Sequence, residues 1–174
     1  DKKVFEMGHE AINLKSNYRG GHTHINMLPT TSHVYFGSKT GATPDGRKAY
    51  QPLSEGISPV QGTDKNGPTA VLKSASKIDH TRTGGTLLNQ KFTPDLMKSE
   101  NNREKIRSLI RSYFKLMGHH IQFNVVSADT LKKAQQNPEK YSNLIVRVAG
   151  YSDYFNNLGK DLQNEIIRRT EHSN

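Results

Sequence analysis

The strongest indication of fold comes from two apolar segments on either side of a short helical pattern. Residues 121–126 are rich in β-branched and aromatic side chains, as expected of a strand, and Ser127 stands where a helix N-cap is expected. Pro138 ends the helical pattern, and the run 144–149 follows with Arg147 as its single charge. A strand, a helix and a strand in this order are typical of a crossover unit with parallel neighbours. The sequence therefore predicts an α/β fold in which the strand over 144–149 is buried on both faces.

The rest of the chain combines weaker patterns with one long segment that lacks periodicity. Residues 1–26 are predicted to be an irregular N-terminal segment, and 27–174 a single domain. Within that domain, 37–68 holds strong turn signals and no apolar periodicity, so we expect a long ordered loop that is functional or wraps a partner surface. The other expected elements are a strand over 32–36, a helix or a strand over 69–76, a strand over 86–92, a helix start at Thr93-Pro94, a main helix over 101–117 and a last helix over 160–171.

The composition excludes several classes of site. The 174 residues contain no Cys, which excludes disulfides, Cys-ligated zinc and a thiol nucleophile within this chain. Only 32% of the residues are hydrophobic, so the core is thin for the length and suggests a piece that packs against something else. No apolar stretch approaches the ~18 residues that a membrane span needs, and the start lacks a signal-peptide core. We therefore expect a cytoplasmic protein with no membrane partner.

The net charge of +9 does not by itself indicate nucleic-acid binding. The basic residues are scattered, apart from one stripe with a four-residue period on the expected main helix, which is typical of a solvated face. We therefore expect no nucleic-acid partner. His22, His24 and His33 could mimic a metal site, but nothing supplies an obvious fourth ligand at a fixed spacing. Surface or hydrogen-bonding roles are expected for these side chains, and no metal.

A glycine follows the second apolar strand directly, in the segment Arg147-Val148-Ala149-Gly150-Tyr151. Taken alone, this glycine could serve only to permit a positive φ or a close backbone approach. The surrounding sequence favours a chemical role. The segments GHHIQFNVVSADTLKKAQQNPEKYSNLIVRVAGY, TGATPDGRKAYQPLSEGISPVQGTDKNGPTAVLKSASKID and GGTLLNQKFTPDL resemble those of the glycyl radical enzymes, in the dehydratase, lyase and decarboxylase branch. The resemblance is closer to hydroxyproline and glycerol dehydratases than to pyruvate formate-lyase.

The resemblance implies both a fold and a chemistry. Whole family members are ten-stranded α/β barrels, of which this chain would supply the C-terminal portion, with a radical loop over 147–158. Gly150 would store a backbone radical, because glycine has two α-hydrogens and no side chain to clash with a flattened radical centre. A dry, rigid site would protect the radical. The neighbours that would support the loop are Arg147, Val148, Ala149 and Tyr151.

The resemblance also implies partners. An S-adenosylmethionine iron–sulfur activase would install the radical under anaerobic conditions, so the chain itself would bind no cofactor, and oxygen would cleave the backbone at the radical. In the family the radical passes to a Cys on another loop, whose thiyl radical attacks the substrate. That Cys is absent here, so this chain would not turn over alone and would need an upstream Cys-bearing part or a separate subunit that carries the Cys.

We therefore expect the radical-bearing C-terminal part of a dehydratase or lyase that acts on a small polar metabolite, in an enzyme that is a homo-oligomer. The alternative is a stand-alone spare-part protein that repairs an oxygen-cleaved enzyme. The substrate is not determined, because the residues that contact it in this family lie mostly in the upstream part.

Three side chains near the glycine raise separate questions. Arg147 is a charge in an apolar strand, so it needs a carboxylate or backbone carbonyls as partners unless its head reaches solvent. Tyr151 could relay electrons, although packing of the loop is the simpler role. His119 and His120 open the strand over 121–126 with side chains on opposite faces, so one of the two could pack near the radical loop.

Overall fold

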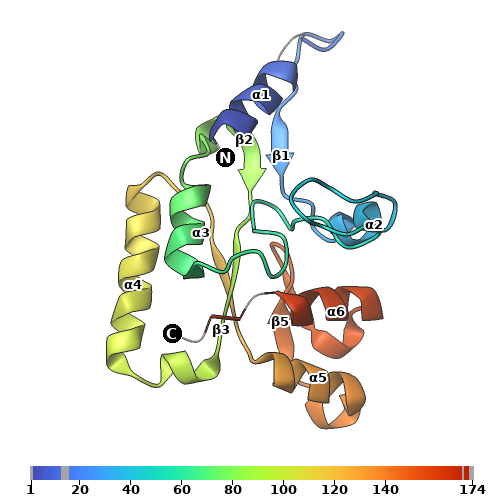
Figure 1. Cartoon of the computed structure of the whole chain (residues 1–174), viewed down its shortest axis with the longest axis vertical. Helices are drawn as coiled ribbons and strands as arrows, with labels where there is room; N and C mark the ends of the chain where they lie inside the picture. The colour runs from blue at the N-terminus through green and yellow to red at the C-terminus, as the bar shows by residue number, and fades with distance from the viewer. Residues whose placement is uncertain (1, 13–15, 170, 173–174) are drawn as a thin grey trace.

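The computed structural model describes residues 2–12, 16–169 and 171–172, which form a mixed α/β fold (Figure 1). Its helices and strands are, in chain order, α1 Lys2–Ile12, β1 Ile25–Met27, α2 Ser32–Ser38, α3 Gly67–Ala75, β2 Thr83–Thr86, β3 Asn89–Phe92, α4 Glu100–Lys115, β4 Gln122–Val125, α5 Ala128–Gln136, β5 Ile145–Arg147, β6 Ser152–Tyr154, α6 Lys160–Arg168 and β7 Glu171–His172. Short 3-10 turns occur at His80–Arg82, Pro94–Met97, Pro138–Tyr141 and Phe155–Asn157. Among the residues described, no helix is long and apolar enough to cross a membrane.

The strands form three small sheets. β3 is the central strand of a parallel sheet of order β4-β3-β7, in which Asn89 pairs with Gln122 and Phe92 pairs with Val125 on one side and His172 on the other. β1 and β2 form a second parallel pair, and β5 and β6 form an antiparallel hairpin. The α/β class is therefore confirmed, whereas this chain by itself does not show the ten-stranded barrel.

The predicted crossover unit is wrong in its strand pairing. The Ser127 hydroxyl does accept the Thr130 amide at the start of α5 (3.2 Å), as predicted, but β5 pairs with β6 and not with β4. The side chain of Asn124 in β4 replaces a backbone ladder, since its Nδ2 donates to the Arg147 carbonyl (2.7 Å) and its Oδ1 accepts the Arg147 amide (2.8 Å). Because this side chain fills the space between the two backbones, β4 and β5 are joined without pairing directly.

The strand over 144–149 is also less buried than predicted. Val146, Val148 and Ala149 are buried, but the side chain of Ile145 is 57% exposed and Arg147 is only partly covered. The strand has one partner, β6, and its other side is held by side chains, so the first residues of the strand reach the surface.

Leu87 and Leu88, which link β2 to β3, connect two hydrophobic clusters. Both are fully buried, and as neighbours in an extended segment they point to opposite sides. Leu87 packs among residues of β5, α5 and α6, whereas Leu88 packs among residues of α3 and α4. Figure 1 accordingly shows α3 and α4 on one side of β3 and α5 and α6 on the other. Each fully buried Leu stabilises the fold by about 1.5–3 kcal/mol, so this pair ties the two clusters together.

Two predictions for the N-terminal part of the chain are wrong. Residues 1–26 were expected to be irregular, but they include helix α1 and the first two residues of strand β1. The expected strand over 32–36 is helix α2, in which His33 and Gly37, four residues apart, are buried while Tyr35 and Phe36 are exposed. Burial that recurs after four residues is typical of a helix. Packing of this buried helix face overrides the strand preference of Val and aromatic residues.

The bounds of several other elements differ from those predicted. The expected strand over 86–92 is divided into β2 and β3, Thr93 precedes a 3-10 turn instead of an α-helix, and the last helix ends at Arg168. The undecided segment 69–76 is helical and belongs to α3. The main helix is confirmed as α4.

Most of the long loop expected over 37–68 is present, because residues 39–66, all of them described, contain no helix or strand, whereas the two ends of the expected range belong to α2 and α3. The loop is ordered by its own polar groups, since the buried Arg47 donates to backbone carbonyls within it. Further along, the Ile57 amide donates to the Leu87 carbonyl (2.9 Å). Gly56 permits this approach, because it has φ +59° and a Cβ there would lie 2.2 Å from the Leu87 carbonyl oxygen.

Candidate functional site

The β5–β6 hairpin ends in a tight turn with Gly150 at its tip. The Val148 amide donates to the Tyr151 carbonyl over 2.9 Å, which leaves Ala149 and Gly150 as the two central residues. Gly150 has φ +80°, a conformation that residues with a side chain rarely adopt. Glycine lacks a Cβ and adopts this φ at little cost. The backbone conformation alone therefore accounts for a glycine here, before any chemistry is considered.

Crowding does not require a glycine at this position. A Cβ on Gly150 would lie 3.6 Å from the Leu87 Cδ1 atom and 4.0 Å from the Leu28 Cδ1 atom, which are ordinary van der Waals distances. Gly150 is exposed, and Tyr151 remains 36% exposed. The dry site implied by the family resemblance is thus not formed by the described residues alone. Packing of the radical loop by Tyr151 stays a prediction.

Two polar side chains bind the tip of the turn. The Gln122 Oε1 atom accepts hydrogen bonds from the Gly150 amide (3.2 Å) and from the Arg147 Nε (2.8 Å). The Arg147 Nη2 in turn donates to the Gly150 carbonyl (3.2 Å), and its Nη1 donates to the Ser152 hydroxyl (3.3 Å). The expected backbone carbonyl partner of Arg147 is therefore confirmed, while an amide and a hydroxyl take the place that a carboxylate could have filled.

The carbonyl of Val148 anchors the base of the turn. It accepts hydrogen bonds from Asn89 Nδ2 (3.2 Å), Gln122 Nε2 (3.3 Å) and Arg169 Nη1 (3.0 Å). These donors come from β3, from β4 and from the residue that follows α6. Side chains from three separate segments therefore fix the hairpin, although β5 has a backbone ladder only with β6.

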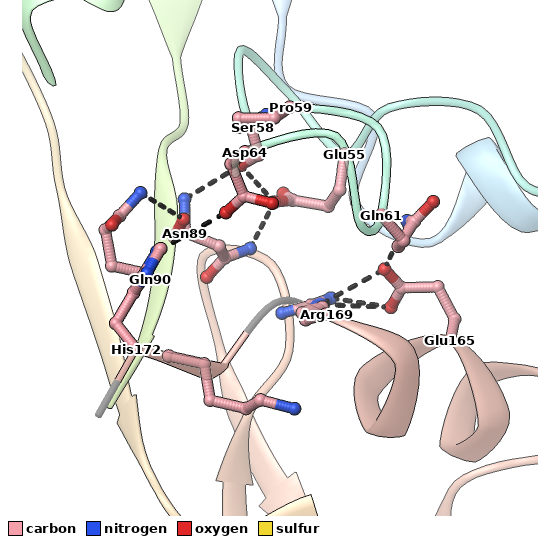
Figure 2. A pocket seen from close by; sticks show the side chains of 11 residues that line it. Glu55, Ser58, Pro59, Gln61, Asp64, Asn89, Gln90, Glu165, Arg169 and His172 are labelled. Atoms are coloured by element: carbon pink, nitrogen blue, oxygen red, sulfur yellow. Dashed lines mark hydrogen bonds and ion pairs between the residues drawn. The ribbon is translucent and has the colours of Figure 1, made fainter. Parts of the chain in front are cut away.

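A small buried cavity of about 30 Å³ lies below this anchor, between the long loop, β3 and α6 (Figure 2). The volume is enough for about one water molecule, so the cavity is too small for a metabolite. Glu165, which is fully buried, accepts hydrogen bonds from Arg169 Nη2 (2.8 Å) and from Gln61 Nε2 (2.8 Å). Its other neighbour is the buried His33, whose Nε2 lies 3.6 Å from the carboxylate.

A second buried carboxylate, Glu55, lines the same cavity. It accepts hydrogen bonds from the Asn89 Nδ2 and from the Ser58 hydroxyl (3.1 Å). Because Asn89 also donates to the Val148 carbonyl, Glu55 is connected to the hairpin through one side chain. The long loop is thus linked to the turn that carries Gly150.

The two buried carboxylates have opposite pKa shifts. Burial raises the pKa of Glu55 to about 7, because the charge of Arg169 and the hydrogen bond of Asn89 compensate only in part. Burial also acts on Glu165, but His33 and Arg169 outweigh it and lower the pKa of Glu165 to about 2. Perturbed carboxylates are found at active sites and in structural ion pairs alike. Since each one here is bonded to groups that hold the loop and α6, we assign both to support of the hairpin.

The predicted His residues lie in different environments. His119 is exposed, with its ring 6.4 Å from the His80 ring, whereas His120 is half-buried. Burial, and then the charge of Arg147, lower the pKa of His120, which places His120 on the side of the hairpin. His22 and His24 are exposed and His33 belongs to the buried network. Within the described ranges, no group of three His, Asp or Glu side chains could hold a metal ion.

The sequence reasoning missed the side chains that hold the hairpin. They are Asn89, Gln122, Asn124 and Arg169. The signal in the sequence was a set of uncharged polar residues inside two short strand patterns, NQKF and QFNV. Such residues are buried only when they are hydrogen-bonded, so their clustering in strands could have indicated a polar anchor.

The fold and the site together define an α/β protein that presents a glycine-tipped hairpin braced by amide and guanidinium side chains. The family described as Glycine radical matches residues 53–156, which include the long loop from Leu53 onward, β3, β4 and the hairpin with Gly150. The chain therefore belongs to the glycyl radical family, as its sequence resemblance implied.

Individual relatives agree with this assignment. The chain is 52% identical over 170 residues to trans-4-hydroxy-L-proline dehydratase of Clostridioides difficile, which covers 98% of this chain and 22% of the relative. It is 46% identical over 171 residues to isethionate sulfite-lyase of Oleidesulfovibrio alaskensis, with 94% of this chain and 21% of the relative covered. The structure of the glycerol-bound B12-independent glycerol dehydratase from Clostridium butyricum superposes with a TM-score of 0.92 at 50% identity, over 99% of this chain and 22% of the other.

The chain spans about a fifth of the length of these relatives. Relatives named for hydroxyproline, isethionate and indoleacetate match it at 52%, 46% and 42% identity. Because enzymes with such different named substrates share this segment, the segment reports the family chemistry more directly than the substrate.

Proposed function

We propose that this chain is the radical-bearing C-terminal part of a glycyl radical dehydratase or lyase, and that Gly150 stores the radical. The observation that carries the proposal is the position of Gly150, at the tip of a braced hairpin inside the region that matches the glycine radical family. Both backbone groups of Gly150 are hydrogen-bonded to side chains, so the residue is held in place while its α-carbon stays accessible.

The chemistry needs one hydrogen atom to leave the α-carbon of Gly150. An S-adenosylmethionine iron–sulfur activase, supplied with one electron by a reductant, would cleave S-adenosylmethionine into methionine and a carbon radical. That radical takes an α-hydrogen from Gly150, and the unpaired electron is then shared between the α-carbon, the adjacent nitrogen and the carbonyl. Glycine suits this exchange because a second α-hydrogen remains and no side chain opposes a flat centre.

The chain requires a partner to use its radical. It contains no Cys, so the thiyl radical of the family chemistry has to form on another polypeptide segment. Gly150 is exposed in this chain, and a persistent radical needs protection from solvent and oxygen. One upstream Cys-bearing part would supply both the thiol and the cover, in a cytoplasmic enzyme that works without oxygen and assembles from several copies of itself.

The relatives support the enzyme over a repair protein. Those compared above are named dehydratases, a lyase and a decarboxylase, and each aligns with nearly the whole of this chain. We therefore propose a reaction of the dehydratase or lyase class on a small polar metabolite, and leave the metabolite open.

Electron paramagnetic resonance of the activated chain tests the proposal. Anaerobic treatment with an activase, S-adenosylmethionine and a reductant should produce an organic radical signal, and oxygen should then cut the backbone at Gly150 and produce a C-terminal peptide that begins at Tyr151. Gly150→Ala should abolish both the signal and the cut. Substrate turnover should require addition of the Cys-bearing part.

The substitution is a fair test because the site tolerates a methyl group sterically. Gly46→Ala is the matched control, since Gly46 is also exposed, also has a positive φ (+95°) and has nothing within 4 Å of its Cβ position. The control should keep the signal. A radical signal of unchanged intensity in Gly150→Ala would refute the assignment.

A further inference from the structure

The side chain of Gln122 has all of its hydrogen-bonding groups engaged around the turn. The residue is 6% exposed. Its Nε2 donates to the Asn89 Oδ1 and to the Val148 carbonyl (3.3 Å), two groups that can only accept. Its Oε1 must therefore face the Gly150 amide and the Arg147 guanidinium. The hydrogen-bond partners thus determine the orientation of the Gln122 side-chain amide.

Gln122, Arg147 and Gly150 form a closed ring of hydrogen bonds. The Gly150 amide donates to Gln122 Oε1 (3.2 Å), the Arg147 Nε donates to the same oxygen (2.8 Å), and the Arg147 Nη2 donates to the Gly150 carbonyl (3.2 Å). The two polar groups that flank the α-carbon of Gly150 are thus bound to a neutral acceptor on one side and to a cationic donor on the other. Gly150 is otherwise exposed, so its N–H and C=O groups would bind water if this ring were absent. The ring gives both groups protein partners in fixed positions.

We infer that Gln122 is a positioning residue for the backbone radical, acting through the Gly150 amide and through the orientation of Arg147. The inference rests on the proposed function, because it requires the radical to reside at Gly150. A radical on an α-carbon is stabilised when the nitrogen beside it releases electron density and the carbonyl beside it withdraws density. The hydrogen bond from the Gly150 amide to Gln122 increases the electron release by the nitrogen. The hydrogen bond from the Arg147 guanidinium to the Gly150 carbonyl increases the electron withdrawal by the carbonyl.

Hydrogen exchange of the resting protein provides the first test, and it needs no radical. In Gln122→Met, which keeps the volume but removes the acceptor, the Gly150 amide should exchange about fivefold to tenfold faster, because one hydrogen bond is lost. Gln163→Met is the matched control. Gln163 is also a buried glutamine, and its Nε2 donates to the Phe155 and Leu158 carbonyls (3.0 Å each), away from Gly150 and Arg147. Exchange at Gly150 should therefore stay as in the wild type.

The radical provides the second test. With ¹⁵N-labelled glycine, Gln122→Met should change the nitrogen hyperfine coupling of the activated protein and shorten the anaerobic lifetime of its signal, while Gln163→Met should leave the coupling unchanged. Gln122→Glu is a conservative rescue, since a protonated carboxyl offers one acceptor and one donor in nearly the same places, and it should restore the coupling at acidic pH. This variant also keeps the test decisive if Gln122→Met does not fold.

The possible outcomes separate the inference from the proposed function. Loss of Gly150 protection together with a changed coupling supports the role of Gln122. The role of Gln122 is overturned if the Gly150 amide of Gln122→Met exchanges as in the wild type. It is also overturned if exchange is faster but the hyperfine coupling and the lifetime of the radical are those of the wild type. In both cases Gly150 remains the radical site. If the activated wild-type protein gives no signal that depends on Gly150, the proposed function fails, and the inference fails with it.

Discussion

Replacement of Glu165 by Gln removes the negative member of a buried ion pair that holds the hairpin to α6. Glu165 accepts three hydrogen bonds from Arg169, through Nε to both oxygens (3.1 Å each) and through Nη2 (2.8 Å). Arg169 also donates to the Val148 carbonyl at the base of the turn. Without the carboxylate, the guanidinium stays buried and loses its hydrogen-bonded counterion.

The expected cost is large compared with the stability of a domain. Breaking a buried pair by removing one partner destabilises a protein by about 3–5 kcal/mol. A free energy of unfolding of about 5–15 kcal/mol is usual, so the variant should lose about a fifth of its stability or more. The lowered pKa of Glu165 is of the same size, because a decrease from the ordinary value of 4.5 to about 2, caused by His33 and Arg169, corresponds to roughly 3 kcal/mol.

The pKa also determines how stability depends on pH. Since the folded pKa of Glu165 is depressed, its contribution is complete above the ordinary value of 4.5 and is lost as the pH falls toward about 2. Urea unfolding monitored by circular dichroism should therefore show a decline in wild-type stability over this interval, and the decline should be smaller in Glu165→Gln.

A double variant separates the ion pair from general disruption. Glu165→Gln combined with Arg169→Gln removes both charges and should cost less than the sum of the two single changes. A loss below about 1 kcal/mol in Glu165→Gln at pH 7, or strict additivity in the double variant, would refute the reasoning.

Two more changes test the long loop that supports the hairpin. In Glu55→Gln, the free energy of unfolding should exceed that of the wild type by up to about 3 kcal/mol at pH 8 and equal it near pH 4. The reason is that the folded pKa of Glu55, about 7, lies above the ordinary 4.5, so the stability of the wild type falls as the pH rises from 4.5 to 7. Urea unfolding at the two pH values measures this, and an equal difference at both would contradict the burial of Glu55. Gly56→Ala should cost about 3–5 kcal/mol, since a Cβ would lie 2.2 Å from the Leu87 carbonyl oxygen at a positive φ, whereas Gly46→Ala should cost only about 1–2 kcal/mol. Thermal unfolding compares the two, and equal costs would show that the loop does not pack on Leu87 as described.

The helices that could be predicted have strong local signals. The main helix α4 carries a regular apolar stripe, and α5 begins at Ser127, whose hydroxyl makes the expected cap. The position of Gly150 at the end of an apolar strand was also evident from the sequence. These features depend on residues a few positions apart, so they can be found without knowledge of the fold.

The pairing of β4 could not be predicted in this way. Alternation in QFNV suggests that the apolar residues face the core, but Gln122 and Asn124 are buried, whereas Val125 is 43% exposed. The polar face is inward because its amides bind the backbone of the hairpin, which is more than twenty residues away in the chain. Hydrogen bonds between such distant segments leave no periodic signal in the sequence.

Arg169 escaped prediction for a related reason. In the sequence it lies in the last turn of the helix predicted over 160–171 and resembles an ordinary C-terminal charge of a helix, which is usually solvated. Its burial results from Glu165, one turn earlier, and from the Val148 carbonyl, so only the packed structure shows its role.

The way α6 packs has a consequence for a molecule damaged by oxygen. A backbone break at Gly150 would leave β6 paired with β5, Phe155 and Ile166 buried in the core, and Arg169 bonded to the Val148 carbonyl. All of these contacts are noncovalent and join residues on the two sides of the break, so the severed tail would remain docked on the body that it came from. Such a nicked protein would keep its size in solution and separate into two pieces only in denaturant, and a replacement segment would first have to displace the old tail.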